Sequence, residues 1–261
     1  MSTFLYRYLS FESFVDMVQR QELAFVLPSL WEDVAEMLLY DKWLEKIDSY
    51  VERALFYAIR SKIYAQSWTK LKESDAMWRI YGPNNLTVKI KIRKLSVALL
   101  DNVRCLDVKY VKSLDKVDLP EKGLESFLQS LSIKRLPFQH EKEVRLVHYY
   151  QFKDTDDATI HAKSIFALGN HEVFKEMFPE TDQRPMEEKI EELISITNLN
   201  NRKSVKYISF SHIKDFIVSA TLHPKAPDWF EETLNDFCKR NGVNFEGKSH
   251  LYDSDKSTFS Y

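Results

Sequence analysis

Ionisable side chains stand at alternate positions of the segment 141–145, which are Glu141, Glu143 and Arg145. Successive side chains of a β-strand point to opposite faces, so a strand here places all three on one face. Such groups are costly to bury unpaired, which predicts either a solvated face, the commoner arrangement, or the wall of a cleft that needs charge. In a cleft, carboxylates can stabilise positive charge or act as bases. Ion pairs of Arg7 or Arg145 with these carboxylates are the structural alternative.

Other side chains able to contact a ligand lie near the ends of predicted elements. They are Arg7 and Tyr8 in the first strand, Ser67 and Thr69 at the polar end of a later strand, and Trp78 and Tyr81 on a short helix. The planar guanidinium of Arg7 suits phosphate or ribose oxygens. Trp78 or Tyr81 could stack on a flat base, although aromatic residues three apart on a helix more commonly pack in a core. Ser67 is equally typical of an ordinary turn.

The composition disfavours several classes of site. A formal net charge of −2 over 261 residues argues against a globally basic nucleic-acid-binding protein. The five glycines, against roughly 18 at average usage, allow neither GxGxxG nor GxxxxGK[ST]. Two cysteines cannot build a disulfide framework or a four-thiolate site, and HExxH is absent, so no metal site is predicted. Without a signal-peptide pattern or a span of ~20 apolar residues, we expect a cytoplasmic protein.

Apolar periodicity and capping residues predict the elements that position these side chains. Strands are expected at 3–9, 23–27, 63–69, 86–92, about 103–111, after the turn-like segment 137–140, and at 204–210, 213–221 and 243–251. Helices are expected at 11–22, from Asp33 to about 60, from Ser74 to Gly82, at 120–131, from Pro185 and at 228–241. The strand at 86–92 alternates and is expected to be half-buried.

The helices do not alternate regularly with the strands, so we predict an α+β fold of mixed, mainly antiparallel sheets with flanking helices. No repeat or composition break marks a boundary, which favours a single domain, 1–261, with a helical excursion at about 33–62. Four tryptophans are expected in the core, namely Trp31, Trp43, Trp68 and Trp229.

The order of the motifs resembles an uncharacterised bacterial family, a domain of unknown function. Its members open on an LYRY segment, as residues 5–8 do here, and carry an Asn/Glu-Asp pair after the second strand, here Glu32-Asp33. An MW–Y box (residues 77–81) and the E-x-E-x-R strand follow. The resemblance covers nearly the whole chain and implies no activity by itself.

More distantly, the same order resembles the ADP-ribosyltransferase fold. In those enzymes an Arg or His on the first strand holds NAD, a Ser-Thr-Ser-like or tyrosine element flanks the nicotinamide, and a Glu, often the second of an E-x-E pair, contacts the ribose. The resemblance gives Arg7 the first role, Ser67 with Thr69 the second, and Glu143 the third. Tyr8, Trp78, Tyr81 and Arg145 complete the implied NAD-binding set.

Cleavage of the nicotinamide–ribose bond builds positive charge on the sugar. A carboxylate hydrogen-bonded to the ribose 2′-hydroxyl stabilises that transition state more than the ground state, which is the role implied for Glu143. Glu141 would orient the nucleophile or act as its base. The implied enzyme transfers ADP-ribose to a protein or nucleic acid, or to water as an NAD glycohydrolase. Bacterial relatives of this fold imply a toxin or antiviral-defence setting, with an antitoxin or other protein as partner.

Two other functions stay open. Asp107-x-Lys109 on a strand, with Glu121 or Glu141 nearby, matches the acid-x-Lys arrangement that binds Mg²⁺ in metal-dependent nucleases. A catalytically silent module could bind a nucleotide or a partner protein through the same cleft, since function lies in sites rather than in folds.

Overall fold

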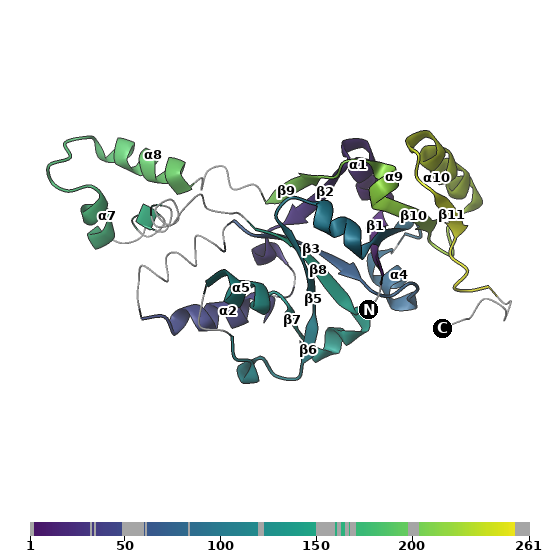
Figure 1. Ribbon diagram of the computed structural model, residues 1–261, viewed down its shortest axis with the longest axis horizontal. Helices are drawn as coiled ribbons and strands as arrows, with labels where there is room; N and C mark the ends of the chain where they lie inside the picture. The colour runs from purple at the N-terminus through teal and green to yellow at the C-terminus, as the bar shows by residue number, and fades with distance from the viewer. Residues whose placement is uncertain are drawn as a thin grey trace.

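The structure is a computed structural model that describes residues 3–31, 33, 35–48, 60, 62–82, 84–119, 123–149, 160, 163–164, 167, 171–197 and 204–253. Nine of the described strands form one sheet in the order β11-β10-β4-β1-β3-β2-β9, to which β8 is added at β3 and β5 at β8. Every pairing in this sheet is antiparallel except that of β10 with β11. The predicted α+β class, with a mainly antiparallel sheet and flanking helices, is confirmed (Figure 1).

The strands of the large sheet are β1 (Phe4–Ser10), β2 (Glu22–Val26), β3 (Tyr64–Thr69), β4 (Thr87–Arg93), β5 (Val103–Asp107), β8 (Glu143–His148), β9 (Val205–Ser209), β10 (Ile217–Leu222) and β11 (Phe245–Lys248). A parallel pair, β6 (Lys109–Val111) and β7 (Ile133–Arg135), forms a second sheet.

The α-helices are α1 (Phe11–Arg20), α2 (Ala35–Glu45), α4 (Asp75–Tyr81), α5 (Gly123–Ser130), α7 (His171–Met177), α8 (Met186–Thr197), α9 (Ile213–Phe216) and α10 (Asp228–Asn241). Short 3₁₀ helices are η1 (Pro28–Leu30), η2 (Lys94–Leu99), η3 (Leu114–Lys116) and η4 (Leu136–Glu141). Within the described ranges, no helix is long and apolar enough to cross a membrane.

Local signals explain where several helices begin and end. The side chain of Ser10 accepts a hydrogen bond from the Ser13 amide, and that of Ser74 accepts one from the Met77 amide, as N-caps do. Gly242 adopts the left-handed conformation (φ 70°) that ends α10. Asp33 accepts from the Ala35 amide at the start of α2.

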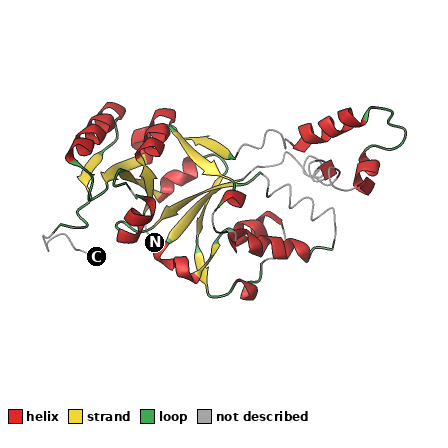
Figure 2. Ribbon diagram, turned by 180° about the vertical axis from the view of Figure 1, so that it is seen from behind, coloured by secondary structure: helices red, strands yellow, loops and turns green. Residues whose placement is uncertain are grey.

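The main core lies between one face of the sheet and helices α1 and α10, which flank the same part of the sheet (Figures 1 and 2). It includes the fully buried side chains of Leu5, Phe14, Ile90, Leu222 and Leu234. A second cluster joins α2 and α5 to β3 and β8. Helices α7 and α8 share a separate small cluster around Val173 and Leu193, and both lie away from the sheet (Figure 2).

The sheet divides at β3. One edge of β3 pairs with β8 along its whole length, from Tyr64 to Thr69. The other edge pairs with β1 at Thr69 and with β2 at Ala65. Strands β1 and β2 therefore diverge from opposite ends of β3, and a fork opens between them beside Gln66 and Ser67.

Several predicted bounds are wrong. The expected strand at 103–111 is interrupted at Val108, so that β5 and β6 join different sheets. The segment 213–216 is helical, and the strand there begins only at Ile217. Strand β4 is buried on both faces from 87 to 90 because β1 and β10 flank it in the interior of the sheet.

Two further expectations concern helices and tryptophans. Helix α2 ends at Glu45, and most of the remaining helical prediction, at 49–59, lies outside the described residues. Trp229 is 62% exposed because it lies on the outer side of α10, so its assignment to the core is wrong.

Candidate active site

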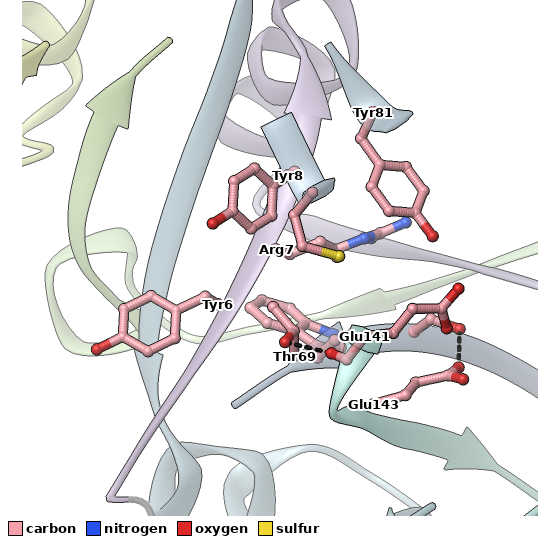
Figure 3. Close-up of a pocket in the computed structure, with 10 residues that line it drawn as sticks. Tyr6, Arg7, Tyr8, Thr69, Tyr81, Glu141 and Glu143 are labelled. Carbon is pink, nitrogen blue, oxygen red and sulfur yellow. Dashed lines mark hydrogen bonds between the residues drawn. The ribbon is translucent and has the colours of Figure 1, made fainter. Parts of the chain in front are cut away.

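A cavity of about 130 Å³ lies at the root of the fork, where β1, β3 and β8 meet. Its walls come from Tyr6, Arg7, Tyr8, Ser67, Trp68, Thr69, Met77, Tyr81, Glu141 and Glu143 (Figure 3). Cross-strand register aligns Tyr6 with Thr69 and Thr69 with Glu143, so these three side chains form one row across the sheet. Arg7, Ser67 and Glu143, predicted from distant parts of the sequence, thus line one hollow.

Arg7 is partly buried and forms no hydrogen bond or ion pair with any described residue. Burial lowers the pKa of its guanidinium to about 10. Its side chain also lines a second hollow of about 400 Å³, which includes Gln66 and therefore lies on the opposite face of β3 from Ser67. Arg7 thus lies in the fork itself, and no described side chain pairs with its charge.

Glu141 and Tyr81 face Arg7 from other walls of the cavity. The guanidinium of Arg7 and the hydroxyl of Tyr81 end near each other, and the carboxylates of Glu141 and Glu143 lie below them in the view of Figure 3. Tyr81 is 43% exposed, and burial, followed by the charge of Glu141, raises the pKa of its hydroxyl. The cavity is therefore cationic on one side and anionic on the other.

The prediction that Glu141 belongs to the same strand as Glu143 is wrong. Glu141 is the last residue of η4, and Lys142 adopts a left-handed conformation (φ 44°) that separates η4 from β8. The Thr69 hydroxyl donates to the Glu141 carbonyl oxygen at 2.6 Å and fixes this turn against β3. Glu141 therefore reaches the cavity from the turn, whereas Glu143 reaches it from the strand.

Glu143 and Arg145 are buried, at 3% and 0% exposure, so the solvated-face interpretation is wrong. Arg145 donates from Nε to Glu143 Oε1 (2.8 Å) and from Nη2 to Oε2 (3.1 Å). Its Nη1 donates to the Leu131 carbonyl oxygen, and its guanidinium lies 4.4 Å from the centre of the Trp31 ring. Arg145 does not line the cavity.

Lys134 and Glu36 complete this cluster and were not predicted. Lys134 Nζ donates to Glu141 (2.6 Å) and to Glu143 (3.1 Å), and lies 3.4 Å from Glu36 Oε1. Glu36, in the first turn of α2, forms an ion pair with Arg145. The only sequence signal for Lys134 is its position shortly before the E-x-E segment, and Glu36 resembles an ordinary acidic residue of a first helical turn.

The cluster shifts the pKa values of its members. Burial alone would raise the pKa of Glu143, but Arg145, Lys134 and Ser67 outweigh it and lower the pKa to about 2. Burial raises the pKa of Glu36 because its contacts with Arg145 and Lys134 do not fully offset the lost hydration. Glu143 is consequently ionised at every physiological pH.

The two hydroxyl residues of the Ser67-Trp68-Thr69 segment have different surroundings. Ser67 is exposed and donates to Glu143 Oε1 at 2.6 Å. Thr69 is 1% exposed and uses its proton for the Glu141 carbonyl. Ser67 is therefore the hydroxyl that a ligand can reach, and Thr69 supports the turn.

Trp78 does not line the cavity, and a stacking role for it is not supported. It is fully buried, packs edge-on against Tyr8 with ring centres 4.7 Å apart, and donates its indole N–H to Glu73. Tyr6 and Met77 line the cavity instead, and neither was predicted as a site residue.

The acid-x-Lys segment of the nuclease alternative, Asp107-x-Lys109, does not resemble a metal site in its surroundings. The Asp107 carboxylate is bound by Lys70 (2.9 Å) and Lys94 (3.4 Å), which lowers its pKa against the effect of burial. Glu121 lies outside the described residues. Among the residues that the structure describes, no three His, Cys, Asp or Glu side chains group as metal ligands do.

Comparison of the chain with protein-family models, with curated proteins and with solved structures finds no match.

Proposed function

We propose that this protein is an ADP-ribosyltransferase-like enzyme that cleaves the nicotinamide–ribose bond of NAD and transfers ADP-ribose to a macromolecule or to water. The observation that carries the proposal is the guanidinium of Arg7, which has no partner among the described residues and lies on the opposite side of a cavity from Glu141 and Glu143. NAD carries complementary charges, with a cationic nicotinamide and an anionic pyrophosphate. Arg7 suits the pyrophosphate, since guanidinium groups bind phosphate oxygens through paired hydrogen bonds.

The cavity volume restricts how NAD can bind. Small-molecule sites commonly have ~300–1,000 Å³, so a cavity of about 130 Å³ does not enclose a dinucleotide. It is close to the ~150 Å³ of an engineered cavity that accommodates benzene. We therefore assign the cavity to one ring of the substrate, the nicotinamide, beside the aromatic side chain of Tyr81. The remainder of NAD would lie outside it, near Arg7 at the fork.

The chemistry follows from the charges. As the glycosidic bond breaks, positive charge develops on the ribose, and nearby fixed carboxylates stabilise it. Glu143 is already ionised and held by three protein side chains, so the site needs no rearrangement when the charge appears. Ser67 is exposed and lines the cavity, and we assign its hydroxyl a contact with the carboxamide or the ribose.

The sequence resemblance supports the same proposal. It requires an arginine of the first strand and a glutamate of a late E-x-E segment in one site, and both line this cavity. It also supplies the proposed setting, a bacterial toxin or antiviral effector, which would act on a protein or nucleic acid acceptor.

The test is incubation of the purified protein with NAD carrying a label on its adenine. We expect release of nicotinamide, measured by chromatography, and label on protein, on nucleic acid or in free ADP-ribose. Arg7→Met should slow release at limiting NAD concentration, whereas Glu187→Gln, an exposed change on α8, should not. Binding of NAD without turnover would identify a binding module instead, and the proposal fails if NAD does not bind. Degradation of DNA or RNA on addition of Mg²⁺ would identify the nuclease.

A further inference from the structure

The acceptor capacity of Glu143 is already used by the protein. Its Oε1 accepts from Ser67 Oγ (2.6 Å) and Arg145 Nε (2.8 Å). Its Oε2 accepts from Lys134 Nζ and Arg145 Nη2, both at 3.1 Å. An ionised carboxylate has about four lone-pair directions, and here each has a donor. A ribose hydroxyl could bond to Glu143 only by displacing one of these partners.

Glu141, unlike Glu143, has a carboxylate oxygen to which no described residue donates. Its Oε2 accepts from Lys134 Nζ at 2.6 Å, whereas its Oε1 has no hydrogen-bond partner among the described residues. The same residue lines the cavity, and the bond from Thr69 to its carbonyl fixes its backbone there. Glu141 thus presents an open acceptor to the ligand while Lys134 supplies the compensating charge.

Ser67 links Glu143 to the cavity. Because the Ser67 hydroxyl directs its proton to Glu143, the lone pairs of Ser67 Oγ remain available on the exposed side. Glu143 thereby makes Ser67 an acceptor for a ligand N–H or O–H. The carboxylate acts on the ligand through this hydroxyl and through the charges that it fixes.

We infer that Glu141, rather than Glu143, is the carboxylate that contacts the substrate, and that Glu143 is a positioning residue that acts through Ser67. The inference rests on the proposed binding of NAD, and it exchanges the roles that the sequence resemblance implies for the two glutamates. Lys134, between both carboxylates and Glu36, holds Glu141 in its ligand-facing orientation.

Chemical labelling tests directly whether the carboxylate of Glu141 is more accessible than that of Glu143. A water-soluble carbodiimide with glycinamide converts accessible carboxyl groups to amides, and trypsin cleavage after Lys142 puts Glu141 and Glu143 on different peptides. The side chain of Glu141 is 11% exposed and that of Glu143 is 3% exposed, so we expect Glu141 to be labelled faster than Glu143 in the folded wild-type protein and to lose its label when NAD is present. Labelling of Glu143 at least as fast as Glu141 would overturn the inference.

Calorimetric titration of the same sample with NAD separates this inference from the proposed function. NAD that binds without protecting Glu141 overturns the inference alone. NAD that does not bind overturns the proposed function and, with it, the substrate contact. Where NAD binds, Glu141→Gln should weaken its affinity roughly 10- to 100-fold, as expected for one hydrogen bond to a charged group.

The positioning role of Glu143 has its own readout. We expect Ser67→Ala and Glu143→Gln each to weaken NAD affinity, the former by about 2- to 10-fold for one neutral hydrogen bond. In the double variant, Glu143→Gln should add little to the effect of Ser67→Ala, because the hydroxyl that it orients is gone. Fully additive losses would show that Glu143 does not act through Ser67. Glu187→Gln is the control and should leave the affinity unchanged.

Discussion

Replacement of Glu143 by glutamine removes the negative charge at the centre of the buried cluster and keeps the shape of the side chain. Glu143 is 3% exposed and accepts hydrogen bonds from Ser67, Lys134 and Arg145. Glutamine would oppose these donors with an amide NH₂ group and leave Lys134 and Arg145 short of a counter-charge. Loss of one partner of a buried ion pair typically lowers the free energy of unfolding by ~3–5 kcal/mol.

The lowered pKa of Glu143 gives a second value for its contribution to the free energy of unfolding. Burial would raise it, but Arg145, Lys134 and Ser67 lower it from the usual 4.5 to about 2. A difference of about 2.5 pH units corresponds to about 3 kcal/mol of stability, at 1.36 kcal/mol per unit. Because the pKa is lower in the folded state, this contribution is complete above pH 4.5 and is lost as the pH falls toward 2.

We therefore expect Glu143→Gln to be folded at neutral pH and about 3 kcal/mol less stable than the wild type, since domains have ~5–15 kcal/mol in total. Denaturant unfolding monitored by circular dichroism measures the difference. The variant should also lose less stability than the wild type between pH 4.5 and 2. Glu187→Gln, on the exposed surface of α8, is the control. Equal unfolding free energies at neutral pH and equal losses in acid would refute the argument that Glu143 is a stabilising centre of the cluster.

Three further predictions concern other residues. Arg7→Met should weaken NAD binding roughly 10- to 100-fold by calorimetry without lowering the unfolding free energy, because the guanidinium has no partner in the part of the chain that the structure describes. A clear loss of stability would contradict this. Tyr81→Phe should weaken NAD binding by about 2- to 10-fold and leave stability unchanged, since its hydroxyl faces the cavity; unchanged affinity would exclude a ligand contact. Burial and Lys206 lower the pKa of His148 from 6.5 to about 4. The unfolding free energy of the wild type should therefore fall by about 3 kcal/mol as the pH falls from 6.5 to 4, and that of His148→Gln should not. Parallel pH profiles of the two proteins would contradict a buried neutral imidazole.

Features that depend on neighbours in the sequence could be predicted. The caps at Ser10, Ser74 and Gly242 determine where α1 and α4 begin and where α10 ends, because each acts on amides or carbonyls within one turn. The bounds of α10 agree with the prediction at both ends.

Features that depend on backbone irregularities could not be predicted. The left-handed conformation of Lys142 moves Glu141 off the strand, but such conformations favour Gly or Asn, and a lysine gives no signal for one. The interruption at Val108 is similar, because the alternating pattern of 103–111 continues through it. Tertiary contacts with β8 and β7 decide which sheet each half joins.

The alternation of charges in the E-x-E-x-R segment did not distinguish a solvated face from a buried one. The segment is buried because Lys134 of β7 compensates the charge of Glu143 and Glu36 of α2 compensates that of Arg145. No local sequence pattern encodes these two contacts. Residues placed by this kind of long-range pairing, rather than by periodicity, are those that the sequence did not reveal.

Arg145 and Arg7 lie in contrasting surroundings, and the contrast bears on which of them could bind a ligand. Arg145 is bound by Glu143, Glu36 and a backbone carbonyl, and the two carboxylates raise its pKa despite complete burial. Arg7 has no such partner among the residues described, and burial lowers its pKa to about 10. The loss of one partner from the Arg145 cluster would cost stability, and a buried charge without a partner is itself costly, so folding accounts for the surroundings of Arg145 but not for those of Arg7. An anionic cluster that faces a cation without a described partner is the arrangement expected where a ligand supplies the anion.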